Sequence, residues 1–216
     1  MKANIIPNFD NFATSRGLTM RRERPEGTTA LFLSRWLKAP HRIGALAPSS
    51  RQLARAMARQ TEIDGDGVVI ELGGGTGSIT RALLAAGLAR PRLVVVERDP
   101  TLAAALRLWF PGVKVLRGDA AELRALLLPL GIERAATVVS SLPLLSMPKR
   151  VRLRIVAEAF ALLGERGTFV QFTYGVSSPL GPESGLVGAV AQRVWWNFPP
   201  AVVWRFRRRP AVAKAA

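Results

Sequence analysis

The most informative stretch of the chain is a glycine-rich segment at residues 68–77, which reads VVIELGGGTG. Its acid is Glu71, and Gly73, Gly75 and Gly77 follow at alternate positions. An apolar run that leads into such a turn, with a helix-compatible stretch at 78–86 behind it, predicts a buried parallel strand and a tight strand-to-helix loop. Because glycine has no Cβ and tolerates positive φ, a ligand can lie against bare backbone here. A glycine-rich turn without a ligand is the structural alternative.

The acid and the glycine spacing decide between classes of ligand. A dinucleotide fingerprint places its third glycine where this chain has Ser78, and a phosphate loop requires a lysine that this turn lacks. The run from Glu71 to Gly77 instead resembles motif I of the S-adenosylmethionine-dependent methyltransferases, in which a carboxylate stands just before the glycines. S-adenosylmethionine carries an ammonium and a sulfonium and no phosphate, so an acid suits this position.

A second acid stands at the end of the next apolar run. Residues 93–96 predict another buried strand, and Glu97 follows it, twenty-two residues after Gly75. In doubly wound nucleotide-binding folds, an acid at the end of the second strand accepts hydrogen bonds from ribose hydroxyls. The position and spacing favour that role for Glu97 over a solvated charge or a partner for Arg98.

A third acid follows the next predicted strand, at 113–116, in the element Gly118-Asp119-Ala120. In methyltransferases with such an element, the acid binds the adenine amino group and the next backbone N–H, here that of Ala120, meets the ring. Asp119 is equally suited to cap the helix that starts near Glu122. Because three acids end three successive strands, we expect them to form one cofactor site.

The rest of the chain alternates between strand and helix patterns. We expect strands at 67–72, 92–97, 113–117, 135–141 and 167–174, and helices at 49–60, 77–86, 99–110, 121–127 and 148–163. This alternation predicts an α/β fold with a mostly parallel sheet and helices on both faces. Segment 201–208 is expected to close the sheet as an antiparallel edge strand, and loop 175–185 is long enough to act as a lid.

Composition restricts the function classes. The chain has 216 residues, 49% of them hydrophobic, with no cysteine and one histidine, which fits one domain without a disulfide framework or a Cys- or His-rich metal site. The N-terminus lacks a signal-peptide core, and no apolar run approaches the ~18 residues that cross a bilayer. We therefore expect a cytoplasmic, metal-free monomer that meets a membrane only from its surface.

The charge is strongly positive and unevenly distributed. The net charge is +16, and residues 1–60 hold eleven basic and three acidic side chains. Arg193 is followed by five more basic residues and no acid. Basic ends favour an anionic partner, either nucleic acid or an anionic membrane. A thermostable protein, or one from a GC-rich genome, that simply uses arginine heavily is the alternative.

Aromatic residues among these cations favour the membrane. The helical pattern at 28–39 carries Phe32 and Trp36 beside basic residues, and Trp195 and Trp196 stand near the basic C-terminal end. Large apolar side chains with cations suit the headgroup region of a bilayer. A core-facing helix and two edge strands are the structural alternative.

Over roughly residues 28–208, the chain resembles the bacterial phosphatidylethanolamine N-methyltransferases of the ribosomal-adenine-dimethylase-related type. The matching elements are Phe32–Lys38, Gly44–Ser50, Val69–Gly77, Gly118–Ala120, Ser140–Leu145 and Gln171–Gly175. Adenine N-methyltransferases carry an Asn and a base-stacking aromatic after the fourth strand, where this chain has Ser141 and Leu144. The resemblance therefore favours a lipid amine, and a ribosomal RNA adenine N6-dimethyltransferase is the alternative.

The resemblance implies a Rossmann-like fold of the class I S-adenosylmethionine-dependent type, with a seven-stranded sheet. It implies successive methyl transfer to phosphatidylethanolamine, which gives mono-, di- and trimethylated lipid (phosphatidylcholine) and S-adenosylhomocysteine. The expected partners are the phospholipid and the anionic inner face of the cytoplasmic membrane, and nucleic acid is not expected. We expect residues 1–40 to form a basic amphipathic docking segment, 41–210 the methyltransferase domain and 211–216 a tail.

The same resemblance implies roles for individual residues. Ser50 and Ser140 are expected at the cofactor, together with the acids and glycines named above. Catalytic roles fall to Tyr174, Ser140 and His41, and the lipid headgroup is expected to contact Tyr174, His41, Arg193, Trp195 and Trp196. Strand-end packing for Tyr174 and a surface position for His41 are the structural alternatives.

Overall fold

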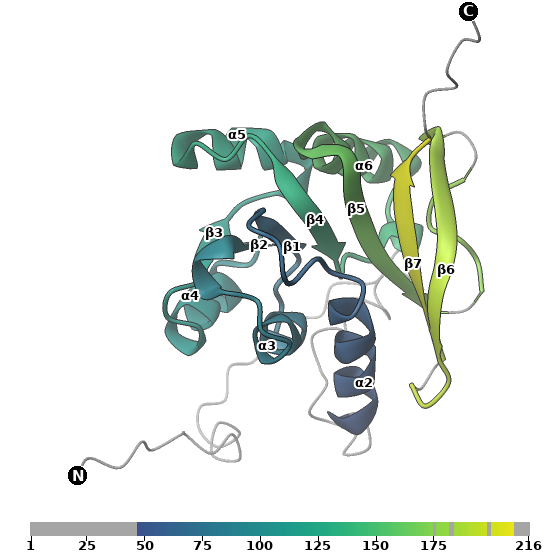
Figure 1. Cartoon of the computed structure of the whole chain (residues 1–216), viewed down its shortest axis with the longest axis horizontal. Coiled ribbons are helices and arrows are strands. Elements are labelled where there is room, and N and C mark those ends of the chain that lie inside the picture. The colour runs from purple at the N-terminus through teal and green to yellow at the C-terminus, as the bar shows by residue number, and fades with distance from the viewer. Residues whose placement is uncertain (1–46, 175, 182–183, 198–199, 210–216) are drawn as a thin grey trace, which may run out of the picture.

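Seven strands form one sheet in the computed structural model of the chain, which describes residues 47–174, 176–181, 184–197 and 200–209 (Figure 1). The strands are β1 (Val69–Leu72), β2 (Leu93–Glu97), β3 (Lys114–Arg117), β4 (Ala135–Ser140), β5 (Leu163–Tyr174), β6 (Leu186–Val194) and β7 (Ala201–Arg208). The α-helices are α2 (Ala47–Ala58), α3 (Ser78–Ala85), α4 (Pro100–Trp109), α5 (Leu123–Leu127) and α6 (Lys149–Leu162). Short 3-10 turns are η3 (Arg90–Arg92), η4 (Ala120–Glu122), η5 (Leu128–Leu130) and η6 (Leu144–Ser146).

The strand order is β3-β2-β1-β4-β5-β7-β6, and β7 runs in the direction opposite to the other six described strands. The direction of strand addition reverses between β1 and β4. In open α/β sheets, ligands bind outside the carboxyl ends of the strands at such a switch point. The candidate binding site is therefore the region beyond the carboxyl ends of β1 and β4, near Glu71 and Ser140.

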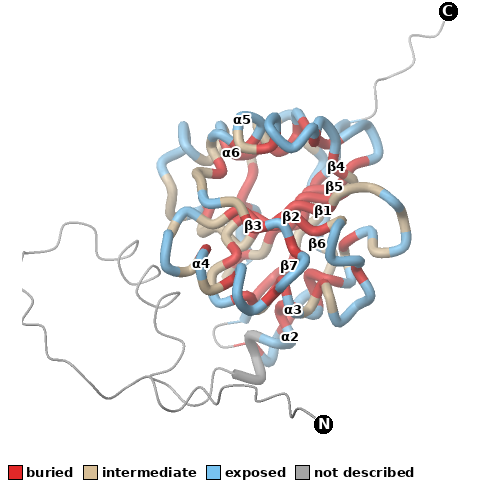
Figure 2. The backbone as a smooth tube through the Cα atoms, turned by 90° about the vertical axis from the view of Figure 1, so that its left-hand side faces the viewer, coloured by how far each residue is buried: buried red, intermediate tan, exposed pale blue. Residues whose placement is uncertain are grey.

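Helices cover both faces of the sheet, with α2, α3 and α4 on one side and α5 and α6 on the other (Figure 1). Successive strand residues point to opposite faces. In β1, Val69 therefore packs with Leu83 of α3, whereas Ile70 packs in the other core with Leu123 of α5. Figure 2 shows the resulting buried sheet between helices whose outer sides are exposed. Two apolar layers thus hold the strand ends in fixed positions.

The predicted parallel strands and their helices are confirmed, with β5 beginning at Leu163, earlier than the expected residue 167. Segment 201–208 is antiparallel as expected, but the edge assignment is wrong because β6 lies outside it. Strand β6 was not predicted. Its residues from Val187 to Val190 are all exposed, so the alternation that identifies a half-buried strand is missing there.

The described part of the loop expected to act as a lid is packed against the domain. Leu180 is buried in the core beneath α6. The Thr173 hydroxyl of β5 donates a hydrogen bond to the carbonyl of Ser177 (3.2 Å). These contacts tie Ser177 and Leu180 to the rest of the protein.

Within the described ranges, no helix has the length and apolar character needed to cross a bilayer. The same part of the chain contains no group of three or more His, Cys, Asp or Glu side chains placed to hold a metal ion. The expected docking segment 1–40 and His41 lie outside the described residues.

Candidate active site

The structure brings Glu71, Glu97 and Asp119 to one edge of the sheet, because they end or follow the adjacent strands β1, β2 and β3. The Gly73 N–H donates to the carbonyl of Val96 (2.8 Å), and the Gly118 N–H donates to the carbonyl of Glu97 (3.1 Å). These bonds continue the pairing of the sheet beyond its last strand residues. The predicted constellation of acids is therefore held by backbone bonds.

The three alternating glycines of the loop differ in what surrounds them. All have positive φ, at 80° for Gly73, 52° for Gly75 and 76° for Gly77. A Cβ on Gly73 would lie 2.9 Å from the side chain of Leu142, and one on Gly77 would lie 2.4 Å from the ring of Phe110. A Cβ on Gly75 would meet only the carbonyl of Gly73, at 4.0 Å. Gly73 and Gly77 thus serve packing within the protein, whereas Gly75 has open space where a Cβ would stand.

Both carboxylate oxygens of Glu97 accept backbone hydrogen bonds, and one of these bonds comes from the glycine loop. Glu97 Oε2 accepts a hydrogen bond from the Gly75 N–H (2.9 Å), and its Oε1 accepts one from the Asp99 N–H (2.8 Å). Each oxygen of a carboxylate can accept a second hydrogen bond, so Glu97 retains capacity for ligand hydroxyls. Arg98, the alternative partner, lies 3.9 Å from Asp119 instead.

Asp119 performs the capping role that the sequence allowed. Its Oδ1 accepts a hydrogen bond from the Ala121 N–H (2.9 Å) at the start of η4. Its Oδ2 makes the long contact with Arg98, and the Asp119 side chain is 46% exposed. The capping bond uses one oxygen, which leaves the other accessible at the strand-end site.

Glu71 is fully buried and only half satisfied. Its Oε2 accepts a hydrogen bond from the Thr80 hydroxyl of α3 (2.6 Å), whereas its Oε1 has no partner among the described residues. Burial raises the pKa of Glu71 to about 8, and the Thr80 hydrogen bond opposes part of the shift. Because an ionised acid is stabilised by a nearby cation, the free oxygen suits the positively charged group of a ligand.

The raised pKa of Glu71 makes a prediction about stability. Between the ordinary pKa of 4.5 and about 8, the folded protein keeps a proton that the unfolded chain has released. The stabilisation is complete below the lower value and is lost as pH rises through the upper one, with a slope of up to about 1.4 kcal/mol per pH unit. Glu71→Gln should flatten this slope in the free energy of unfolding, measured by denaturant titration from about pH 5 to about pH 8.

A matched control for this experiment is Glu133→Gln, which changes an exposed acid just before β4. It should leave the pH slope of the wild type unchanged. Equal slopes for wild type and Glu71→Gln would mean that Glu71 does not hold the proton.

Gln171 of β5 fixes the loop that follows β4, a role that the sequence did not reveal. It is 1% exposed and pairs with Ser140 across the two strands. Its Nε2 donates to the carbonyls of Leu142 (3.0 Å) and Phe172 (2.8 Å), and its Oε1 is buried without a partner among the described residues. Ser140 itself is fully buried, and its hydroxyl accepts the Leu142 N–H (3.3 Å). Both side chains therefore support the loop from inside.

Ser141 joins this loop to the glycine loop. It stands where adenine N-methyltransferases have an Asn. Its N–H donates to the carbonyl of Leu72 (3.0 Å) and its hydroxyl donates to the carbonyl of Gly73. A displacement of one loop would therefore be transmitted to the other.

Tyr174 ends β5 at the same edge of the sheet. Its ring meets that of Phe172 edge-on at 5.3 Å between centroids. Burial raises the pKa of Tyr174, and a hydrogen bond with the side chain of Asn197 partly offsets the shift. The hydroxyl thus stays protonated at ordinary pH and acts as a hydrogen-bonding group. Buried Asn197 belongs to the turn between β6 and β7, and no sequence pattern predicts this contact.

The remaining predicted residues lie away from the strand-end acids or beyond the described structure. Trp195 and Trp196 are 67% and 85% exposed in the turn after β6, and Arg193 is exposed at the end of that strand. Ser50 lies in the first turn of α2, but its side chain is not among those described, and His41 precedes the described residues.

Known proteins resemble the chain in sequence. It is 38% identical over 146 residues to the ornithine lipid N-methyltransferase of Singulisphaera acidiphila, and the match covers 66% of this chain and 76% of that protein. It is 34% identical over 71 residues to ribosomal RNA small subunit methyltransferase A of Chlorobium phaeobacteroides, but this match covers 33% of this chain and 25% of that protein. No family model matches the chain.

Solved structures resemble the fold. Magnesium protoporphyrin IX methyltransferase from Synechocystis PCC 6803, with bound S-adenosylmethionine, has a TM-score of 0.59 at 13% identity, over 84% of this chain and 92% of that one. The N-methyltransferase NodS from Bradyrhizobium japonicum WM9 has a TM-score of 0.60 at 14% identity, over 75% of this chain and 97% of that one. At such identities the solved structures show the fold alone, which is that of the class I S-adenosylmethionine-dependent methyltransferases. The long sequence match to the ornithine lipid enzyme shows that the chain belongs to the lipid N-methyltransferase family within this class.

Proposed function

We propose that the chain transfers methyl groups from S-adenosylmethionine to the amine of phosphatidylethanolamine, giving mono-, di- and trimethylated phospholipid in turn. The observation that carries the proposal is the direct joining of the glycine loop to the loop after β4 through Ser141. One loop offers open backbone at Gly75 beside a half-satisfied buried acid. The other stands where the acceptor lies in N-methyltransferases. Membership of a lipid N-methyltransferase family supports a lipid amine as the acceptor.

The strand-end residues fit S-adenosylmethionine. The free oxygen of Glu71 suits the ammonium, Glu97 has acceptor capacity for the ribose hydroxyls, and Asp119 with the Ala120 N–H suits the adenine edge. A cation beside Glu71 would lower the pKa of that acid, so binding should release a proton at pH values below the free-state pKa of about 8. When bound, this cofactor supplies an electrophilic methyl group on sulfur.

The acceptor side must present a neutral amine in line with that methyl. A water-poor pocket favours the neutral form by lowering the pKa of the amine, and alignment then provides most of the acceleration. In our proposal, Gln171 holds the loop carbonyls that orient the amine N–H groups. The ring of Tyr174 stabilises the ammonium that forms. Ser50 and Ser140 contribute to the cofactor side, and His41 contacts the lipid phosphate.

Variants of Tyr174 test its part in this proposal. Tyr174→Phe removes one hydrogen bond and should lower turnover about tenfold with little change in cofactor affinity. Tyr174→Ala also removes the ring and should be severely impaired. Turnover is measured on mixed micelles by separating the methylated lipids, and cofactor affinity by calorimetry.

Asn197→Ala is the matched control for Tyr174→Phe, because it removes the partner of the hydroxyl and keeps the hydroxyl itself. It should cost stability but preserve more turnover than Tyr174→Phe. Full activity of Tyr174→Ala would show that Tyr174 is a packing residue and that the acceptor pocket lies elsewhere.

Gln171 is expected to act on turnover through the loop. Gln171→Leu removes the two donors that hold the carbonyls of Leu142 and Phe172, so we expect turnover to fall about tenfold while cofactor affinity changes little. The thermal midpoint is measured in parallel. A variant with a lowered midpoint but unchanged turnover at low temperature would make Gln171 a purely structural residue.

We further propose that the enzyme works as a monomer on the inner face of the cytoplasmic membrane. Support comes from the basic, aromatic-rich sequence of residues 1–40, which forms a docking segment ahead of the domain at 41–210 and the tail at 211–216. Deleting residues 1–27 should then reduce association with anionic vesicles and leave cofactor binding nearly intact.

A second candidate acceptor is ornithine lipid, because the relative that shares 38% identity is an ornithine lipid N-methyltransferase. Both lipids offer a primary amine near the membrane surface. The ribosomal RNA alternative has less support, since Leu144 replaces the base-stacking aromatic and is 1% exposed.

The experiment that tests the proposal incubates the protein with methyl-labelled S-adenosylmethionine and either phosphatidylethanolamine vesicles or ribosomal RNA, followed by extraction with chloroform. We expect label in the organic phase with vesicles and no label on the RNA. Label that stays with the RNA would contradict a lipid acceptor.

A further inference from the structure

The turn between β6 and β7 presents two indole rings to solvent. Trp195 is 67% exposed and Trp196 is 85% exposed. Tryptophan side chains bury a large apolar area and keep one polar N–H, so adjacent exposed tryptophans mark a surface that a partner covers. The residue that follows them, Asn197, is buried and bonded to Tyr174, which ties the turn to the domain.

The position of this turn follows from the strand register. Val194 of β6 pairs with Ala201 of β7, and Ala201 pairs with Tyr174 at the carboxyl end of β5. The turn therefore projects beyond the edge of the sheet at which the parallel strands end, as the lower right of Figure 1 shows. That edge carries the cofactor acids and the acceptor loop.

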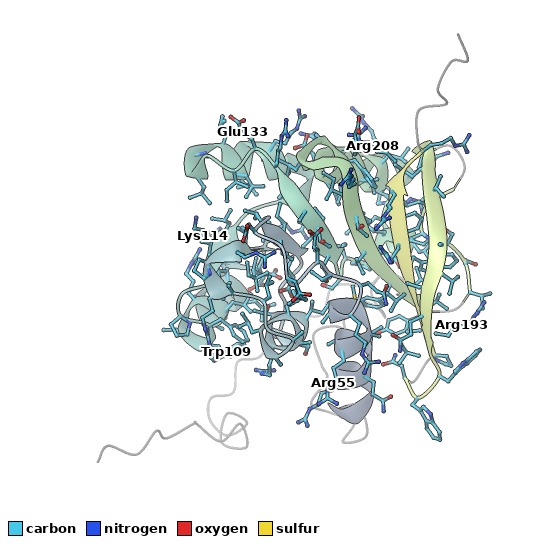
Figure 3. The ribbon with its side chains drawn as sticks, viewed as in Figure 1. Arg55, Trp109, Lys114, Glu133, Arg193 and Arg208 are labelled. Carbon is cyan, nitrogen blue, oxygen red and sulfur yellow. The ribbon has the colours of Figure 1, made fainter. Side chains whose placement is uncertain are left out.

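The surroundings of the turn are positively charged. Arg193 is exposed beside it, and residues 186–209 contain no acid. Helix α2 packs against β6 and β7 and exposes Arg51 and Arg55. Figure 3 shows Arg55 and Arg193 in the lower part of the molecule, towards the side from which the turn projects. A negatively charged surface is complementary to this part of the protein.

We propose that Trp195, Trp196 and Arg193, which we call the tip surface, dock on the headgroup region of an anionic bilayer. The inference rests on the proposed lipid substrate. A bilayer fits better than RNA or a protein because indole rings with adjacent cations suit the water–lipid boundary. The acceptor edge must also reach headgroups to methylate them. Docking there turns the carboxyl ends of the parallel strands towards the membrane. The hydrogen bond between Asn197 and Tyr174 links the docked turn to the part of the site that we propose receives the lipid amine.

The test compares two double variants of the full chain. W195A/W196A removes the tip rings, and L108A/L128A removes two exposed leucines, 81% and 70% exposed, on α4 and η5. Both are sedimented with vesicles of phosphatidylcholine and phosphatidylglycerol in equal parts, which contain no amine acceptor. We expect W195A/W196A to partition at least about tenfold more weakly than wild type, and L108A/L128A to match wild type.

A second measurement separates docking from a role in the pocket. Methyl transfer is compared on phosphatidylethanolamine vesicles and on a short-chain phosphatidylethanolamine below its critical micelle concentration. W195A/W196A should lose far more activity on vesicles than on the monomeric lipid. Because the sedimentation uses no substrate, its outcome stands even if phosphatidylethanolamine proves not to be the acceptor.

Several results would overturn the tip surface as a membrane site. Equal partitioning of W195A/W196A and wild type would do so, as would an equal loss of activity on both forms of lipid. A wild type that elutes as a dimer, with W195A/W196A eluting as a monomer, would assign the tip to contact between copies. Loss of RNA binding with unchanged vesicle partitioning would assign it to nucleic acid.

Discussion

Gly75→Ala should weaken S-adenosylmethionine binding by roughly 10- to 100-fold, the equivalent of about 1–3 kcal/mol of overpacking. The protein itself has room for the added methyl group, because a Cβ there would meet only the carbonyl of Gly73 at 4.0 Å. The loss must then come from a ligand that occupies this space. Calorimetric titration with S-adenosylmethionine measures it directly.

The control for Gly75→Ala is Gly131→Ala. Gly131 has a φ of 65°, close to the 52° of Gly75, and a Cβ there would meet nothing within 4 Å. Both variants carry the same backbone strain of about 1 kcal/mol, so they should lower the thermal midpoint similarly. Only Gly75→Ala should affect binding. Unchanged affinity in Gly75→Ala would show that the ligand does not lie against this loop.

Glu97→Ala should weaken cofactor binding by at least about tenfold, because each hydrogen bond to a charged group that it removes contributes ~1.5–3 kcal/mol. The structure adds a second cause. The same carboxylate accepts the Gly75 and Asp99 N–H groups, so its loss also releases the loop that cradles the ligand. Calorimetry gives the affinity, and hydrogen exchange at the Gly75 amide reports the release of the loop.

Two further variants separate these causes from a general loss of charge. Glu133→Ala removes one negative charge just before β4 and should leave binding unchanged. Glu97→Gln keeps one oxygen but turns an NH2 group towards one of the two donors, so its affinity should fall between those of wild type and Glu97→Ala. Wild-type affinity in Glu97→Ala would remove Glu97 from the cofactor site.

Strands β1 and β2 could be predicted because each is a short apolar run that stops at a glycine or an acid. β1 stops at the glycine loop, and β2 stops at Glu97. β6 gave no such signal. It is an edge strand with Gly188 and Ala189 in its middle and exposed residues in succession, so no buried face imposes an alternating pattern.

In the site, too, features set by local sequence patterns could be predicted, whereas contacts between distant segments could not. The placement of Glu71, Glu97 and Asp119 could be predicted because neighbouring parallel strands end at one edge. The bonds of Gln171 to the loop after β4 and of Asn197 to Tyr174 could not. They join segments that are far apart in sequence, and only the packing of the sheet brings those segments together.

A competition between two lipids measures which amine this enzyme methylates. Vesicles that contain phosphatidylethanolamine and ornithine lipid in equal amounts are incubated with the protein and S-adenosylmethionine, and the products are followed by mass spectrometry. We expect phosphatidylethanolamine to gain one, two and then three methyl groups, while ornithine lipid is methylated much more slowly. Methylation of ornithine lipid with phosphatidylethanolamine unchanged would show that phosphatidylethanolamine is not the acceptor.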